Sequence, residues 1–330
     1  NDITQTHHCS EQCRRRSAQG RYWAAITRYC IMNVLLYAAT VLIWGTTWIA
    51  ISMQTGTVAP LVSVFYRFAL AAALMLVVLS LLGRLRRIGG RDHLFCMLQG
   101  VCVFGLNFYC FYSANAYINS GLESVLFSLA TLFNAANSAL FFGLRPGRRL
   151  LWANLLGLVG IVCLFWHDLR SAHLSALVLT GIGLSLLGTY GFSLGNMISV
   201  RHQRRGLDIL STNAYAMGYG ASAMLLLALL RGDAFTVDWS PTYIGSLLYL
   251  AIVGSIIGFA AYFALVGRIG AGAAAYATVL FPLIALGLST VFEGYQWSGM
   301  AVIGLVLILF GNLVMFYRPR PSAAAVPAAE

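Results

Sequence analysis

The chain has 330 residues, of which 59% are hydrophobic and only 9% are charged. Soluble domains carry roughly 25% charged residues, so the composition excludes a soluble globular protein. The formal net charge is +11, and arginine alone supplies the basic residues because the sequence has no lysine. A chain without lysine has neither a Walker-type phosphate loop nor a Schiff-base lysine, which excludes ATP-driven transport by this chain alone.

Long apolar runs recur along the chain. Runs of about 20 residues cross a hydrocarbon core roughly 30 Å thick, and these runs are apolar around most of a helix, unlike the single stripe of a soluble core helix. We therefore expect an all-α polytopic membrane protein with ten transmembrane helices. The expected spans are residues 33–53, 60–82, 93–113, 119–142, 150–167, 174–199, 209–230, 241–266, 271–292 and 297–317.

The segment before the first span is polar. Residues 1–31 lack the apolar core of a signal peptide, and the first methionine is Met32. We expect this extension to be disordered or foreign to the native protein, with Met32 as the natural start. Its histidines and cysteines fit no standard zinc spacing, so we expect no metal and no cofactor. We also expect the tail, residues 318–330, to be disordered.

The arginines are distributed unevenly between the loops. If both termini are cytoplasmic, 18 arginines lie on the cytoplasmic side and two, Arg170 and Arg231, lie outside, with Arg67 inside a span. Positive charge is enriched in cytoplasmic loops, so this alternation favours an integral protein of the bacterial inner membrane with both termini in the cytoplasm. The same distribution argues against nucleic acid as a partner; the expected surroundings are the lipid bilayer.

An internal repeat divides the chain. Residues 118–143 align with 269–294 at an offset of 151, and Trp44-Gly45 resembles Tyr190-Gly191. We expect two repeats of five helices each, residues 32–168 and 174–317. An odd number of spans forces the second repeat to enter the membrane from the opposite side. Inverted repeats of this kind are typical of transporters with a central site.

Two motifs carry a family resemblance. The first span reads Leu42-Ile43-Trp44-Gly45-Thr46-Thr47-Trp48, and the second contains Tyr66-Arg67-Phe68. Over residues 33–316 the chain resembles the EamA-type family of the drug/metabolite transporter superfamily. The resemblance implies a ten-helix fold that exports small metabolites, often amino acids, through a cavity enclosed by spans one to four and six to nine. The sequence departs from the family at span four, where Thr131 stands opposite Pro282, the expected gating kink of span nine.

Two charged residues in the spans invite functional interpretations. Arg67 lies at membrane depth, where a charge is costly and often functional. It could bind a substrate carboxylate with its forked guanidinium, or it could pair with backbone carbonyls and reach toward the interface. Glu123, near the outer end of span four, is the candidate for proton coupling if it is buried. Alternatively it lies at a solvated helix start, as we expect for Glu293 at a helix end.

A polar stripe runs along the fourth span. Its members recur every three or four residues and so share one helical face: Ser124, Ser128, Thr131, Asn134 and Ser138. The stripe predicts a cavity lining, with helix–helix hydrogen bonding as the alternative. We expect Asn107 and Phe111 in span three and Asn196 in span six to extend this lining.

Aromatic residues form a second group of candidates. Trp44, Tyr190, Tyr262 and Tyr276 lie in spans one, six, eight and nine. An aromatic cavity suits amphipathic metabolites or organic cations, whereas core packing or interfacial anchoring is the alternative. For Trp48 we expect interfacial anchoring.

These patterns predict a secondary transporter that exports small amphipathic metabolites such as amino acids by alternating access. The partners are a small-molecule substrate and lipid, with a monomer or homodimer as the assembly. An uncoupled facilitator is the alternative within transport. From other classes, a membrane enzyme acting on lipid-linked substrates would have to use the cluster of His167, Asp168 and His173, and a scaffold would move no solute.

Overall fold

The computed structural model describes residues 2–56, 58–118, 120–144, 147–164, 166, 176–292 and 297–316, with side chains described at most of these positions from Thr27 onward. Over these residues the regular secondary structure is entirely helical, which confirms the expected all-α class. The elements are α1 (Asp2–Ser52), α2 (Pro60–Leu81), α3 (Gly90–Gln99), η1 (Gly100–Leu106), α4 (Asn107–Ala114), α5 (Ser120–Ser128), α6 (Ala130–Phe142), α7 (Arg148–Leu164), α9 (Ala176–Arg204), α10 (Ile209–Arg231), α11 (Pro241–Tyr249), η2 (Leu250–Ile257), α12 (Gly258–Ile269), α13 (Ala271–Ala275), η3 (Tyr276–Val279), α14 (Phe281–Phe292) and α15 (Gly299–Phe316).

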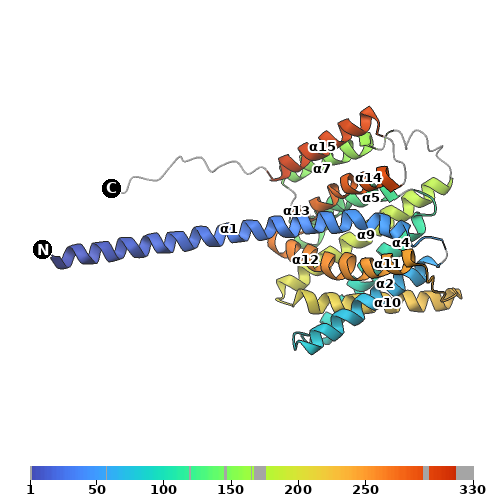
Figure 1. The fold of residues 1–330 in the computed structure, drawn as a ribbon, viewed down its shortest axis with the longest axis horizontal. Helices are drawn as coiled ribbons and strands as arrows, with labels where there is room; N and C mark the ends of the chain where they lie inside the picture. Colours follow the sequence, from blue (N-terminus) through green and yellow to red (C-terminus); the bar gives the residue numbers. More distant parts are fainter. Residues whose placement is uncertain are drawn as a thin grey trace.

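Helix α1 is much longer than a membrane span and projects from the bundle (Figure 1). Residues 2–31 continue the first helix, where the sequence predicted disorder. The segment contains one glycine and no proline, so nothing in it breaks a helix. Its place in the native protein stays a prediction.

Among the described residues, seven helices are long and apolar enough to cross a membrane. They are Thr27–Ser52, Pro60–Leu81, Gly90–Ala114, Ala176–Arg204, Ile209–Arg231, Pro241–Ile269 and Ala271–Phe292. Leu126–Phe142 and Gly299–Gly311 are apolar but shorter. Large apolar side chains such as Leu81 and Leu230 lie on the outer surface of the bundle. Lipid accommodates such a surface, whereas water does not.

The helix packing repeats between the halves of the chain. Helix α7 packs on α15, and α2 packs on α10. Helix α1 packs on α12 and α14, and correspondingly α9 packs on α4 and α6. Exchanging the described helices before residue 165 with those after residue 175 leaves this pattern unchanged. The structure therefore contains two similar halves that meet along the centre of the bundle (Figure 1).

The irregular backbone segments also match. The offset of 151 residues carries the π-helix η1 onto residues 251–257 of the π-helix η2. It also carries the break at Leu129, between α5 and α6, onto the break at Leu280, between η3 and α14. The sequence predicted inequivalent halves here because Thr131 faces Pro282. Pro282 lies in the first turn of α14, where the missing N–H of proline costs little. The matching break at Leu129 forms without a proline.

Candidate functional site

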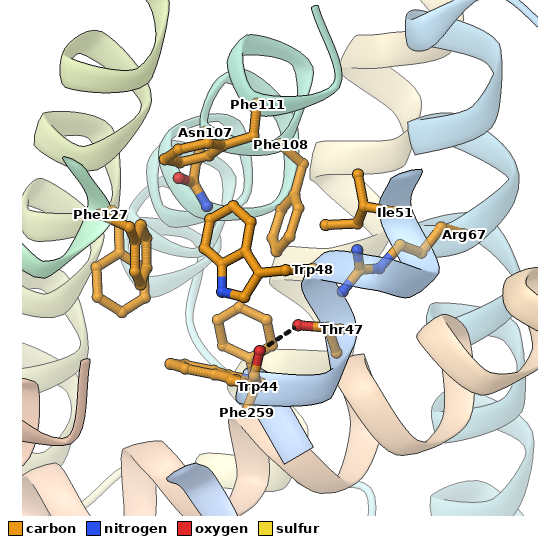
Figure 2. Close-up of a pocket in the computed structure, with 11 residues that line it drawn as sticks. Trp44, Thr47, Trp48, Ile51, Arg67, Asn107, Phe108, Phe111, Phe127 and Phe259 are labelled. Atoms are coloured by element: carbon orange, nitrogen blue, oxygen red, sulfur yellow. Dashed lines mark hydrogen bonds between the residues drawn. The ribbon is translucent and has the colours of Figure 1, made fainter. Parts of the chain in front are cut away.

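A chamber lies at the centre of the bundle (Figure 2). Its volume is about 30 Å³, room for one or two water molecules but not for a metabolite. Helices α1, α2, α4 and α5 supply most of its lining, and α9 and α12 supply one residue each. The lining residues are Trp44, Thr47, Trp48, Ile51, Arg67, Asn107, Phe108, Phe111, Phe127, Phe192 and Phe259.

Aromatic rings form most of the chamber wall. The Trp44 ring lies 4.7 Å from Phe259, and the Trp48 ring lies 5.1 Å from Phe111, centroid to centroid. Trp48 lies among the other lining side chains (Figure 2) and is only 6% exposed. The expectation of interfacial anchoring for Trp48 is corrected: four residues after Trp44 on α1, it shares the inward face of that helix.

Arg67 is the charged residue of the chamber lining. Its side chain is 1% exposed, so it does not reach toward the interface. The Nε group donates a hydrogen bond to Ser255 Oγ at 3.0 Å, and the guanidinium lies 4.3 Å from the Phe108 ring centroid. None of the ion pairs between described residues involves Arg67. The guanidinium is thus buried with only neutral groups around it.

The π-helix η2 holds both Trp44 and Arg67. Ser255 Oγ donates to the Leu250 carbonyl five residues earlier, at 2.8 Å, while accepting from Arg67. The Trp44 indole donates to the Gly254 carbonyl at 3.1 Å. Gly254 must be small, since a Cβ would lie 2.8 Å from Thr47 Cγ2. The π-helix thus presents a backbone carbonyl to Trp44 and a serine hydroxyl to Arg67. Local π-helical turns are frequent at functional sites.

Three buried polar atoms around the chamber have no hydrogen-bond partner among the described protein atoms. They are Trp48 Nε1, Arg67 Nη1 and Asn107 Oδ1. Each belongs to a residue that lines the chamber. Native proteins rarely leave buried polar atoms unpaired, so such atoms indicate a place for water or a bound molecule.

A polar cluster adjoins the chamber. Asn196 on α9 donates to Asn134 Oδ1 at 3.2 Å and to the Tyr262 hydroxyl at 3.0 Å. The Tyr262 ring in turn lies 4.8 Å from Trp44. All three predicted residues are fully buried, and their hydrogen bonds join α6, α9 and α12. Asn134 therefore acts in helix–helix bonding, the alternative interpretation of the stripe, one layer away from the chamber.

Other predicted residues lie away from the chamber. Ser128 and Thr131 border a separate void of about 10 Å³. Tyr190 is 39% exposed on the outside of α9, and the aromatic residue of α9 that lines the chamber is Phe192. Tyr190 and Phe192 are two positions apart, which corresponds to a rotation of about 200° around the helix axis. The sequence match of Tyr190 with Trp44 therefore selected a residue on the opposite face of α9. Tyr276 donates to the Ala153 carbonyl at 2.8 Å and anchors α7.

Of the acidic candidates, the structure describes Glu123 but not Glu293 or Asp168. Glu123, in the first turn of α5, is fully buried, so the interpretation as a solvated helix start does not hold. It does not line the chamber. Glu293, Asp168, His167 and His173 lie outside the described residues.

Two vestibules lie at opposite ends of the bundle. The Gln54 vestibule, about 480 Å³, lies beside the end of α1, and the Gln203 vestibule, about 320 Å³, lies beside the end of α9. Tyr112 donates to Gln54 Oε1 at 2.7 Å, and Gln203 Nε2 donates to the Phe263 carbonyl at 3.0 Å. Phe263 follows Tyr112 at the offset of 151. The glutamines are 149 residues apart, so the two contacts lie at similar places in the repeats, one beside each vestibule. Neither glutamine belongs to a sequence motif, so nothing in the sequence signals these contacts.

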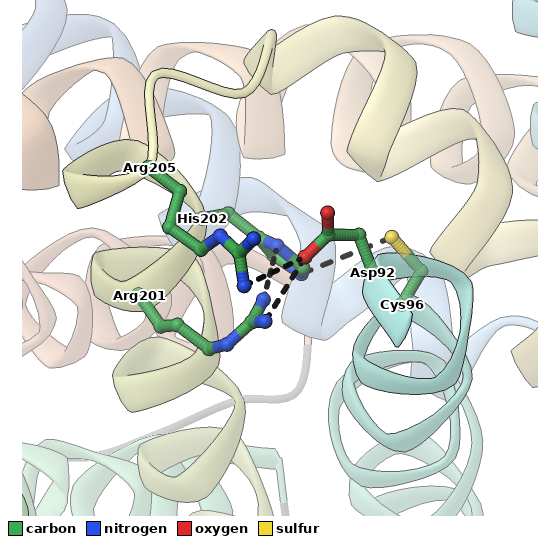
Figure 3. Close-up of polar contacts among 5 residues, drawn as sticks. All are labelled: Asp92, Cys96, Arg201, His202 and Arg205. Atoms are coloured by element: carbon green, nitrogen blue, oxygen red, sulfur yellow. Dashed lines mark hydrogen bonds and ion pairs between the residues drawn. The ribbon is translucent and has the colours of Figure 1, made fainter. Parts of the chain in front are cut away.

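An ion-pair network joins α3 to α9 at the Gln203 end of the bundle (Figure 3). Asp92 lies 2.9 Å from Arg201 and 3.6 Å from Arg205. The Arg201 guanidinium lies 3.6 Å from the Phe95 ring, and His202 Nε2 lies 3.8 Å from Cys96 Sγ. Only the rarity of acidic residues singles out Asp92 in the sequence, and that signal does not name its partners.

Comparison with known proteins identifies the family to which the chain belongs. The model of the EamA-like transporter family matches residues 31–166 and 179–317, one match for each half. A probable amino-acid metabolite efflux pump of Salmonella typhimurium is 28% identical over 85% of this chain and 93% of its own length. The uncharacterized inner membrane transporter YedA of Escherichia coli K12 is 27% identical over 85% and 92%. A solved crystal structure shares the fold, with a TM-score of 0.68 and 18% identity over 86% of this chain and 97% of its own. The chain belongs to the EamA-like transporter family.

Proposed function

We propose that this protein is a secondary transporter that exports small amphipathic metabolites, amino acids or related compounds foremost, across the bacterial cytoplasmic membrane by alternating access. The observation that carries the proposal is the closed chamber between the two repeats, with a vestibule beside each end. The printed names of the relatives, which include an amino-acid metabolite efflux pump, support the substrate class.

The proposal includes ten membrane spans in two inverted repeats. Helices α1, α2, α3–η1–α4, α5–α6 and α7 would be the first five spans, and α9, α10, α11–η2–α12, α13–η3–α14 and α15 the second five. The two matches of the family model, at residues 31–166 and 179–317, support this division. Arginine placement supports cytoplasmic termini, with the Gln203 vestibule on the cytoplasmic side.

Alternating access would use the matched glutamine contacts. Breaking the Gln203 contact would open the chamber to the cytoplasm, and breaking the Gln54 contact would open it to the outside. Both contacts are formed in this structure and the chamber holds only about 30 Å³, so this conformation corresponds to the closed intermediate of the cycle. Rocking of similar repeats about a central site is how inverted-repeat carriers work.

Glu123 is our proposed proton-coupling residue. It is buried in α5, and the matching residue in the second repeat is Ala274. A carboxyl group inside a membrane protein changes its charge at a pH set by its surroundings. A single titrating group in one repeat suffices to couple transport to a proton gradient.

The test is a flux assay with the purified full chain in proteoliposomes. We expect saturable flux of amino acids, accelerated by a pH gradient, and loss of that acceleration in Glu123→Gln with gradient-free exchange retained. Liposomes that move no amino acid, organic cation or related metabolite would refute transport. Equal wild-type flux with and without the gradient would refute coupling and favour a facilitator.

A further inference from the structure

We propose that Arg67 is the anchoring cation for a carboxylate of the transported molecule. The chamber would then take monocarboxylates that carry a hydrogen-bond donor next to the carboxylate and an apolar body. The inference rests on the proposed function, because it assigns the substrate chemistry of the same chamber.

The first argument is the electrostatic surroundings of Arg67. The guanidinium is 1% exposed, and no described carboxylate lies within ion-pair distance of it. Ser255 Oγ is a neutral acceptor at 3.0 Å, and the rings of Phe68 and Phe108 give partial stabilisation at 5.1 and 4.3 Å. A buried charge is normally compensated by an opposite charge. A bound anion would supply that charge.

The second argument is the free hydrogen-bonding capacity around the same chamber. Arg67 Nη1 and Trp48 Nε1 are buried donors without a protein partner, and Asn107 Oδ1 is a buried acceptor without one. A carboxylate accepts from the guanidinium, which suits its forked geometry. An ammonium or hydroxyl group next to the carboxylate would donate to Asn107.

The lining also limits the charge and shape of the ligand. Arg67 is the one charged residue among those that line the chamber, and most of the others are aromatic. One cation balances a carboxylate but not a doubly charged phosphate. The rings of Trp44, Phe111 and Phe192 offer apolar contact to the rest of the molecule. The chamber must widen to admit it, since its volume is now about 30 Å³.

Tyr112 separates one vestibule from Arg67. Tyr112, whose hydroxyl donates to Gln54, lines the Gln54 vestibule and interacts with the Arg67 side chain. Opening the Gln54 contact would therefore join the vestibule to the guanidinium. A second arginine, Arg231, lines that vestibule but is paired with Tyr109 and Asp233.

The experiment compares matched probes on the full chain in proteoliposomes. Leucine carries both charged groups, leucinamide lacks the carboxylate, and 4-methylpentanoate lacks the ammonium. We expect leucine to inhibit leucine counterflow at a concentration about tenfold or more lower than leucinamide does. A difference of this size is expected when a binding site loses its charged partner. We expect 4-methylpentanoate to fall between them if Asn107 binds the ammonium. Equal competition by leucine and leucinamide would overturn the assignment.

Variants identify the residue responsible. Arg67→Gln should remove the preference for leucine over leucinamide, and Arg67→Lys should keep a weaker preference. Arg231→Gln, the matched arginine outside the chamber, should retain the wild-type preference. An Arg67→Gln protein that folds and still discriminates as the wild type does would overturn the proposal.

A binding measurement separates this inference from transport itself. Leucine should raise the unfolding temperature of the detergent-solubilised wild type more than leucinamide does, and this difference should vanish in Arg67→Gln while Arg67→Lys keeps part of it. Absence of flux with this stabilisation intact would refute the proposed function and leave the site assignment standing. Flux of other solutes without any carboxylate-dependent stabilisation would refute the site alone.

Discussion

The two repeats agree in their backbone irregularities and differ in the side chains that they present to the chamber. The π-helices η1 and η2 coincide at the offset of 151 residues, as do the breaks at Leu129 and Leu280. By contrast, all but two of the chamber residues, Phe192 and Phe259, belong to the first repeat. The two repeats therefore share their irregular backbone, whereas one repeat supplies most of the side chains that line the chamber.

Asn107 illustrates the physical basis of this difference. The matching residue of the second repeat is Gly258, where a Cβ would lie 2.5 Å from Trp44 Nε1. The indole of the first repeat thus occupies the space that a side chain of the second repeat would need.

The largest expected effect on stability comes from giving the first repeat the residue that the second repeat has where η1 crosses α10. Gly100 on η1 is matched by Ala251 on η2, but a Cβ at Gly100 would lie 2.2 Å from the Ala216 carbonyl oxygen on α10. Because backbone atoms cannot move aside, Gly100→Ala should destabilise the protein by about 1–3 kcal/mol or more. Thermal unfolding of the purified variants measures this. Gly183→Ala, with nothing within 4 Å of the new Cβ, is the control and should be neutral.

The next comparison concerns the start of spans three and eight. Asp92 pairs with Arg201, whereas the matching Tyr243 shares a hydrogen bond of 3.0 Å with Ser63. Asp92→Asn should lower the unfolding temperature more than Tyr243→Phe, because it leaves two arginines without their anion. The Tyr243→Phe change should cost about 1 kcal/mol, the value of an ordinary hydrogen bond. A larger loss in Tyr243→Phe would contradict this ranking.

A smaller, directional effect is expected at the glutamine contacts. Tyr112→Phe removes the donor to Gln54, and Gln203→Leu removes the donor to the Phe263 carbonyl. In a cysteine-free background, a cysteine at Ile51 of the chamber reports access to water-soluble thiol reagents. Tyr112→Phe should raise labelling several-fold from the Gln54 side only, and Gln203→Leu from the Gln203 side only. Increased labelling from both sides in either variant would mean that the contacts do not control separate openings.

The smallest effect is expected from exchanging the residues at the matched helix breaks. Thr131→Pro places proline in the first turn of α6, as Pro282 lies in the first turn of α14. Proline is tolerated there, so stability should change by less than about 1 kcal/mol. Ala135→Pro, in the interior of α6, should cost about 3 kcal/mol. Unfolding temperatures of the two variants decide whether Leu129 is a true break.

Parts of the site followed from the sequence for clear reasons. Trp44, Arg67, Asn107 and Phe111, which the sequence singled out as polar or aromatic groups inside apolar spans, line the chamber; their role in binding stays a prediction. Tyr190 lies on the exposed face of α9 and Tyr276 bonds to the α7 backbone, because hydropathy does not distinguish one face of an apolar span from another. Asn134 and Asn196 bond to each other, which helical spacing alone could not reveal.

The sequence by itself determined the helical membrane class, the repeat and the family, because hydrophobicity and spacing along the chain record them directly. Only the tertiary structure decided which faces of the helices meet. It brought Arg67 of α2 to Ser255 of η2, 188 residues away, and paired Asp92 with Arg201. Such contacts depend on how close the backbones approach at glycines such as Gly100 and Gly254, and on where a π-turn changes the helical register. Both features arise only when the helices pack together, so the sequence alone does not predict them.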